Sequence, residues 1–191
     1  AYRLKNIADT ILKPEQHSGY RKLMGSIYGP RLTALGDDVT AGTHSGEPAQ
    51  RRALRESLLP LVALEARDPA RRAKLLGAAK AYLGGDAHAL DTSFRAVALQ
   101  VAVQDGDVAF LARLKDTLLK SSDPQFKRDI SVAIGAADTA ALADEALAIA
   151  TSPGVGSPES MNILSLLARQ PGSRDRTTAF ARNNFARLMD L

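Results

Sequence analysis

The feature that most constrains the fold is a series of short alanine- and leucine-rich segments, each preceded by a residue that can cap a helix. Asp68 and Asp123 are each followed by proline, which is well tolerated at the first helical position. After Asp91, apolar residues follow the i, i+3, i+4, i+7, i+8 stripe of an amphipathic helix: Phe94, Val97, Ala98, Val101 and Ala102. Aromatic residues make up only 5% of the chain, which also disfavours strands. The sequence predicts an all-α protein.

The helix starts recur with a regular spacing. Intervals of 31 to 35 residues separate Asp91, Asp123 and Ser157, and likewise Asp107, Asp138 and Ser173. Helix pairs that recur at this period are typical of an α-solenoid of the HEAT or armadillo type, in which each pair buries its apolar stripe against the next. We therefore expect one helical array over residues 1–191, and we expect the helices that begin at Asp123 and Asp138 to form one antiparallel pair, each capped by its aspartate.

Individual helices have local signals of their own. The segment that opens at Pro48 or Ala49 contains Pro60, which predicts a kink or a split. The helix after Asp68 should end at Gly84-Gly85. We expect two further apolar stripes, which consist of Val108, Leu111, Leu114 and Leu118 after Asp107, and of Ala181, Phe185, Leu188 and Met189 after Ser173.

The first 48 residues give weaker signals. Residues 2–13 and 18–36 resemble two helices, the second of them interrupted at Gly29-Pro30. Residues 36–48 are polar and rich in glycine, which predicts an internal loop. The chain starts without methionine and ends without a helix stop signal, so we expect it to be a fragment of a larger domain.

Composition excludes several classes of function. There is no cysteine, which rules out disulfides and thiol catalysis but fits the cytoplasm and the periplasm or a secreted protein alike, so the compartment is unknown. No apolar run approaches the roughly 18–20 residues of a membrane span. The net charge is +4, with the basic residues scattered among acids as in Arg51-Arg52 and Arg55-Glu56, a pattern typical of solvated helical surfaces rather than of nucleic-acid binding.

No motif indicates chemistry. His17, His44 and His88 lack the spacing of a helical zinc site, and we expect His44 to be solvated. Gly42–Gly46 resembles a nucleophile elbow and Gly154–Gly156 a dinucleotide loop, but both are better explained as turns. Asp37-Asp38 could be calcium ligands, but the remaining ligand spacing of a calcium loop is missing. Asp144-Glu145, and Glu56 with Glu65, could be acid–base pairs but are better explained as solvated helix faces or partners of helix charges. We therefore assign no catalytic, cofactor-binding or metal-binding residue.

The order of the segments resembles a known family. QRRALRESLLPLVALEA (50–66), the run over residues 91–150 and TTAFARNNFARLMDL (177–191) are similar to successive helices in the C-terminal domain of aminopeptidase N-like zinc aminopeptidases, the gluzincin family. The last segment carries phenylalanine where tryptophan is common in the family. The resemblance is good over about residues 48–191 and weaker before them.

The resemblance implies a non-catalytic role for this segment. The zinc ligands of the family lie in a catalytic domain of the same parent chain, and none of its catalytic motifs occurs here. In such enzymes the C-terminal α-solenoid encloses the active site, limits the access of peptides and can contact the substrate. Two alternatives to this role are a free-standing HEAT-like scaffold for protein–protein interaction and a HEAT-like nucleic-acid-binding protein, the latter suggested only by the positive charge.

Overall fold

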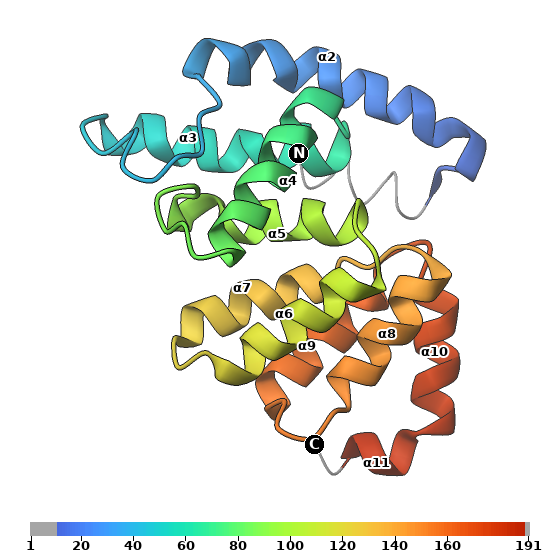
Figure 1. Ribbon diagram of the computed structural model, residues 1–191. Helices are drawn as coiled ribbons and strands as arrows, with labels where there is room; N and C mark the ends of the chain where they lie inside the picture. Colours follow the sequence, from blue (N-terminus) through green and yellow to red (C-terminus); the bar gives the residue numbers. More distant parts are fainter. Residues whose placement is uncertain (1–10, 190–191) are drawn as a thin grey trace. The chain divides into compact units, whose positions relative to one another are not determined.

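The computed structural model describes residues 11–189, and every regular element in this part of the chain is a helix (Figure 1). This confirms the all-α prediction. The chain divides into two compact units, residues 1–101 and 102–191. We describe each unit by itself, and the continuous array over the whole chain stays a prediction.

The first unit consists of helices around a shared apolar core. Its elements are η1 (Pro14–Gln16), α2 (His17–Leu35), α3 (Ala49–Pro60), the π-helix η2 (Leu61–Glu65), α4 (Pro69–Leu83), η3 (Thr92–Phe94) and most of α5 (Arg95–Gln104). Helix α2 packs on α3 and η2, and η2 also contacts α4. The stripe predicted after Asp91 is confirmed, because all five of its residues are buried.

The expected interruption of the second helix at Gly29-Pro30 is wrong. Helix α2 runs through Pro30 without a break. Met24 and Leu32, on either side of the proline, are fully buried in contact with the rest of the unit. Their burial compensates for the hydrogen bond that proline removes, so packing overrides the local preference. Residues 1–10, which include most of the first expected helix, lie outside the described residues.

Pro60 does change the helix, as predicted. Helix α3 ends at Pro60 and continues as the π-helix η2, in which the Ala66 amide donates to the Leu61 carbonyl five residues earlier. The wider winding leaves carbonyl groups that need other donors. Arg72, itself buried, meets one of them by donating to the Ala63 carbonyl at 2.9 Å.

The second unit has the stacked arrangement of a solenoid. Its elements after α5 are α6 (Val108–Lys120), α7 (Pro124–Ile134), α8 (Ala140–Ala150), α9 (Ser157–Leu167), α10 (Arg174–Asn183) and α11 (Phe185–Met189). Helices α6 and α7 are in contact, as are α8 and α9. The first pair stacks on the second through contacts of α6 with α8 and of α7 with α9, and α10 continues the stack on α8 and α9. Helices α6 to α9 thus bury their apolar residues within the stack.

This pairing corrects two expectations. The helices that follow Asp123 and Asp138 belong to successive pairs, because α7 packs on α6 and α9 rather than forming a pair with α8. Asp123 caps α7 by accepting from the Gln125 amide, as predicted. The N-cap of α8 is Thr139, whose hydroxyl accepts from the Leu142 amide, so the helix starts one residue later than expected at Asp138.

Two predicted stripes also need correction. Val108 is 41% exposed, and Phe110, which the pattern did not include, lies in the core with Leu111. In the first turn of α6, Phe110 therefore takes the buried position that the predicted stripe assigned to Val108. The helix predicted after Ser173 breaks at Asn184, and Phe185 at the start of α11 is exposed. The side chain of Met189, the last residue of the predicted stripe, lies outside the part that the structure describes.

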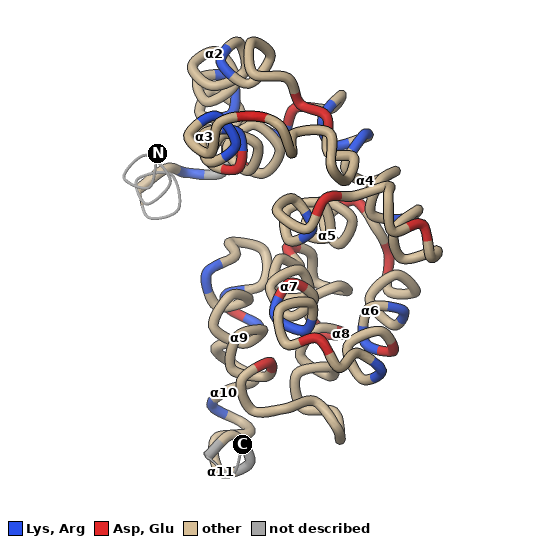
Figure 2. The backbone as a smooth tube through the Cα atoms, turned by 90° about the vertical axis from the view of Figure 1, so that its left-hand side faces the viewer, with Lys and Arg blue, Asp and Glu red and all other residues tan. Residues whose placement is uncertain are grey.

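Charges and hydropathy agree with the sequence-based interpretation. No helix within residues 11–189 is long and apolar enough to cross a membrane. Figure 2 shows Lys and Arg interspersed with Asp and Glu along the helices of each unit. Such a distribution is typical of solvated helix faces.

We predict that replacing Ser160 with alanine leaves the second unit equally stable or stabilises it by up to about 1 kcal/mol. The Ser160 hydroxyl on α9 is fully buried and has no hydrogen-bond partner among residues 11–189. The substitution removes a desolvated polar atom and leaves only a small void. Urea unfolding of both proteins measures the difference. A loss of more than about 1 kcal/mol would contradict the prediction and would mean that the hydroxyl has a partner after all.

Candidate functional site

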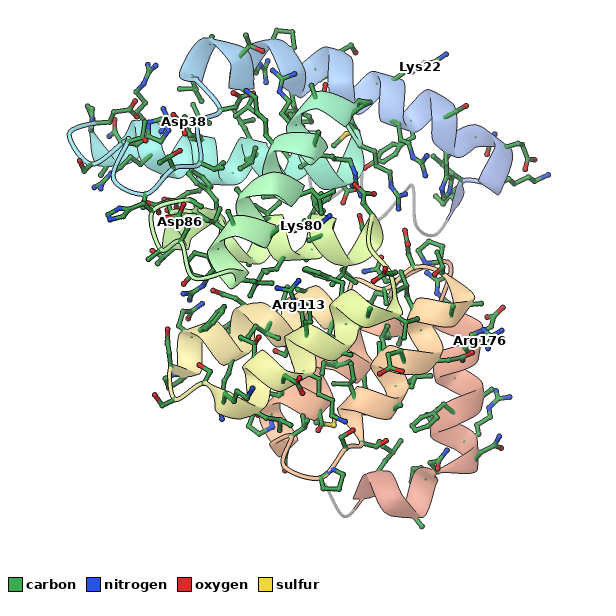
Figure 3. All side chains as sticks on the ribbon, in the orientation of Figure 1. Lys22, Asp38, Lys80, Asp86, Arg113 and Arg176 are labelled. Carbon is green, nitrogen blue, oxygen red and sulfur yellow. The ribbon has the colours of Figure 1, made fainter. Side chains whose placement is uncertain are left out.

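The predicted loop over residues 36–48 joins α2 to α3 and is held in place by the residues around it. Asp37 accepts from the Arg71 Nε at 3.0 Å and from the Lys74 Nζ at 2.9 Å. Asp38, labelled in Figure 3, accepts from the Thr40 amide at 2.9 Å. These two carboxylates therefore fasten the loop to α4 and shape its first turn, which is a structural role and not that of calcium ligands.

Arg55 on α3 lies at the centre of the contacts between this loop and the helices. Its side chain is 1% exposed. Its Nε donates to the Gly36 carbonyl at 2.9 Å, and its Nη2 donates to the Leu35 carbonyl at 2.7 Å, so the guanidinium caps the C-terminus of α2. The same Nη2 lies 2.8 Å from the Glu47 Oε2. The expectation of a solvated basic surface is wrong for Arg55, while Arg52 one turn before it is exposed as expected.

His44 is also more enclosed than predicted. Its side chain is 14% exposed, and its Nε2 lies 2.8 Å from the Asp38 carbonyl. Because a carbonyl oxygen only accepts, this Nε2 carries the hydrogen. The Nδ1 lies 3.3 Å from the Glu47 Oε1. The ring therefore links the two ends of the loop, which is why the expectation of a solvated histidine is wrong.

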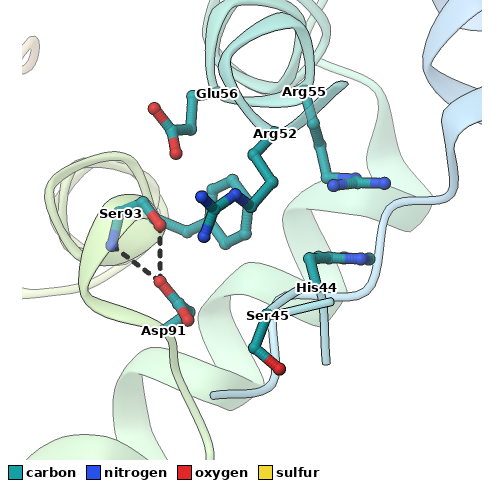
Figure 4. Close-up of a pocket in the computed structure, with 8 residues that line it drawn as sticks. His44, Ser45, Arg52, Arg55, Glu56, Asp91 and Ser93 are labelled. Atoms are coloured by element: carbon teal, nitrogen blue, oxygen red, sulfur yellow. Dashed lines mark hydrogen bonds between the residues drawn. The ribbon is translucent and has the colours of Figure 1, made fainter. Parts of the chain in front are cut away.

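A small pocket opens beside these contacts (Figure 4). It is about 130 Å³ in volume and takes its lining from three segments: His44 and Ser45 of the loop, Arg52, Arg55 and Glu56 of α3, and Asp91, Ser93 and Phe94 at the start of η3. Pockets for drug-sized ligands are several times larger, at roughly 300–1,000 Å³. This pocket has room for a chemical group of a few non-hydrogen atoms.

The carboxylate pairs considered in the sequence are not brought together. Glu65 accepts a hydrogen bond from the Tyr20 hydroxyl at 3.1 Å, while Glu56 lines the pocket. Asp144 accepts from Arg176 of α10 at 2.8 Å (Arg176 is labelled in Figure 3). Neither arrangement provides two carboxylates facing one substrate atom, which acid–base catalysis would require.

The glycine-bearing segments are turns. Gly42 and Gly154 have φ values of 79° and 87°, which only glycine adopts readily. Ser45 lies on the rim of the pocket, with no strand before it. No group of three or more His, Asp or Glu side chains within residues 11–189 could hold a metal ion. No sequence motif marks the pocket, because its lining comes from segments nearly 50 residues apart.

Carboxyl groups around the loop share one electrostatic property. Their pKa values are lowered, and the groups concerned are Asp37, Asp38, Glu47 and Asp91. At Asp91, burial raises the pKa, but hydrogen bonds from the Ser93 hydroxyl and amide outweigh it. At Asp37, burial likewise acts upward, and the hydrogen bond and charge of Lys74 outweigh it. The loop therefore favours ionised carboxylates.

These shifts predict an acid-sensitive first unit. A carboxyl whose pKa is lower in the folded state adds stability above its unfolded pKa of about 4, and this stability is lost as the pH falls through the folded pKa. We expect the free energy of unfolding to fall between about pH 5 and pH 3. Asp91→Asn keeps an acceptor for Ser93 but removes one titrating group, so its stability deficit should be largest at pH 7 and shrink toward pH 3. A deficit that is constant with pH in urea unfolding would contradict this.

Comparison with known proteins gives one match. The family model described as the ERAP1-like C-terminal domain matches residues 2–191. The comparisons with curated proteins and with solved structures produced no match.

Proposed function

This chain belongs to the ERAP1-like C-terminal domain family, and on that premise we propose that it is the non-catalytic C-terminal helical segment of a zinc-dependent aminopeptidase. The family match over residues 2–191 is the observation that carries the proposal. The all-α fold and the stacked helix pairs of the second unit support it. The alternative of a free-standing interaction scaffold has no such observation in its favour.

The zinc would be bound by the catalytic domain of the parent protein. There it would activate water and polarise the peptide carbonyl. The residues that the structure describes do not fit a zinc site. Both ring nitrogens of His44 face oxygen atoms of the loop, and no cluster of three or more ligand side chains occurs between residues 11 and 189. The contribution of this chain would therefore be to shape the space around the active site.

We further propose that the helices of this chain pack against the catalytic domain and restrict which peptides reach the zinc. A stack of helix pairs offers an extended surface of this kind, because each pair adds area without needing a closed core. The peptide substrate could contact this surface beyond the scissile bond. This finer role rests on the family relationship and on the stacked architecture.

A first experiment tests the assignment. The isolated chain is expected to bind no stoichiometric zinc and to release no chromophore from aminoacyl p-nitroanilides, while the protein encoded together with its upstream sequence should do both. Metal analysis and a colorimetric assay measure these properties. Zinc bound stoichiometrically by the isolated chain, or hydrolysis by it, would refute the assignment.

A second experiment tests the restriction of access. We would compare the parent enzyme with a version that lacks this segment, using a dipeptide-sized chromogenic substrate and a polypeptide of about 50 residues. Without the segment, the ratio of kcat/KM for the long substrate to that for the short one should rise. The zinc content and circular dichroism of the truncated enzyme serve as the folding control. A ratio that stays unchanged in a correctly folded, zinc-loaded enzyme would refute the role in access.

A further inference from the structure

One hydrogen-bond donor of a residue that lines the pocket has no acceptor among residues 11–189. Arg55 is fully buried and lines the pocket, and its Nη1 has no hydrogen-bond partner in this part of the chain, although its Nε and Nη2 are fully used by the C-terminus of α2 and by Glu47. Buried guanidinium hydrogens are almost always paired, since a desolvated donor without an acceptor is costly. An oxygen atom supplied from outside the chain would satisfy this donor.

A second guanidinium reaches the same pocket. Arg52 precedes Arg55 by one helical turn, so both side chains project from the same side of α3. Figure 4 shows the Arg52 guanidinium in the middle of the lining residues. The side chain of Arg52 makes neither a hydrogen bond nor an ion pair with the residues that the structure describes. Two arginine side chains therefore line one small pocket, and each has an N–H donor without an acceptor in the described part of the chain.

The carboxylates of the lining differ in what they leave free. Asp91 accepts from the amide and the hydroxyl of Ser93, which are drawn as dashed lines in Figure 4, and its second oxygen lies 3.4 Å from the Gly42 amide. Its charge is thus largely satisfied by the chain itself. Glu56 lies four residues after Arg52 on α3, and no ion pair joins the two side chains in the described part of the chain. It is the lining group that would compete with an incoming anion for Arg52.

We propose that this pocket binds one carboxylate group between Arg52 and Arg55. The planar guanidinium matches a carboxylate through paired, charge-assisted N–H···O bonds, and the volume of about 130 Å³ admits a carboxylate with one or two further carbons. The carboxylate comes either from an acidic side chain of a neighbouring protein segment or from a small free acid. The proposal does not depend on the aminopeptidase assignment, because it rests on the pocket alone.

Acetate titration followed by NMR tests the proposal. Cross-peaks of the Arg52 and Arg55 side chains and of the Ser45 and Ser93 amides should shift with saturation, with a Kd on the order of 1–10 mM for so small a ligand. Sodium chloride keeps the ionic strength constant, and uncharged acetamide is the matched control ligand. Arg52→Gln should weaken acetate binding about tenfold, since one of two guanidinium groups is lost. Arg113→Gln, an exposed arginine on α6 labelled in Figure 3, should leave it unchanged.

A further variant tests the charge of the bound group. Glu56→Gln removes the competing carboxylate and should strengthen acetate binding about threefold. Weaker binding in this variant would overturn the proposal, because it would mean that the ligand needs a negative partner. Linear shifts without saturation, equal shifts with acetamide, or an Arg52→Gln variant that binds acetate as tightly as the unaltered chain would also overturn it.

The two sources of the carboxylate are distinguished by a second ligand. N-acetylglutamic acid α-methylamide presents only a side-chain carboxylate, flanked by peptide groups. Binding at least tenfold tighter than that of acetate identifies an acidic side chain as the occupant, since the peptide groups then add contacts at the rim. Binding as tight as that of acetate, or weaker, identifies a small free carboxylate. Either result supports the pocket as a carboxylate site, provided that the acetate titration saturates.

Discussion

Replacing Arg55 with alanine is expected to lower the free energy of unfolding by about 3 kcal/mol. The buried guanidinium donates to the Leu35 and Gly36 carbonyls and pairs with Glu47. Its removal leaves two carbonyl groups at the end of α2 without these donors and a partly buried carboxylate without its main cation. The stability lost in this way exceeds the net contribution of the hydrogen bonds, because the groups that remain are buried and cannot bond to water instead. Urea unfolding monitored by circular dichroism measures the loss.

Two variants make this prediction specific. Arg55→Lys should recover little of the stability, because a single ammonium cannot reproduce the planar guanidinium, which donates to the C-terminus of α2 and to Glu47 at the same time. Arg52→Ala is the matched control on the same helix, and its effect should stay within about 0.5 kcal/mol, since the Arg52 side chain is exposed and has no hydrogen-bond or ion-pair partner among residues 11–189. If Arg55→Ala costs no more than Arg52→Ala, the guanidinium does not hold the loop to the helices.

Local signals in the sequence were sufficient to place most helix starts. Asp68, Asp107 and Asp123 each accept a backbone amide of their own first turn, and this needs no information from the rest of the chain. The stop at Gly84-Gly85 is equally local, because α4 ends at Leu83 and Gly85 has a φ of 105°. Solenoid-like stacking also followed from the sequence, since it depends on the spacing of such signals.

Tertiary contacts decided the features that the sequence did not reveal. Arg52 and Arg55 are the same residue type three positions apart, yet one is exposed and the other is buried, because only Arg55 faces the C-terminus of α2. Pro30 remains helical since Met24 and Leu32, before and after it on α2, are packed in the core. The pairing of α7 with α6 rather than with α8 likewise depends on which stripes meet in space.

The pocket illustrates the same limit for the candidate site. It has no motif, because its lining is assembled from a loop, a helix and the start of a second helix. The sequence-based hints were the polar loop predicted over residues 36–48 and the family-like segment 50–66, which contains Arg55. Neither hint distinguishes a solvated arginine from one that caps another helix. The hydrogen-bond donors that line the pocket could therefore be identified only from the three-dimensional structure.

The second prediction with a large effect concerns Gly172, in the turn between α9 and α10. A Cβ atom at this position would lie 1.7 Å from the Asp138 carbonyl oxygen, far inside contact distance. The turn that leads into α10 thus packs directly on the backbone that precedes α8, and a backbone oxygen cannot rotate away as a side chain can. Gly172→Ala should therefore separate α10 from α8 and lower the free energy of unfolding of the second unit by about 3 kcal/mol.

Gly77→Ala is the matched control for this prediction. Gly77 lies inside α4 on an exposed face, and no atom would come within 4 Å of an added Cβ. The same substitution should stabilise the chain there by about 0.5–1 kcal/mol, because alanine is the better helix former. Opposite signs for the two glycine-to-alanine changes in urea unfolding would identify the close approach at Asp138 as the cause. A loss of less than about 1 kcal/mol for Gly172→Ala would contradict the prediction. It would show that the turn can shift and that α10 packs less tightly on α8 than the contact distance implies.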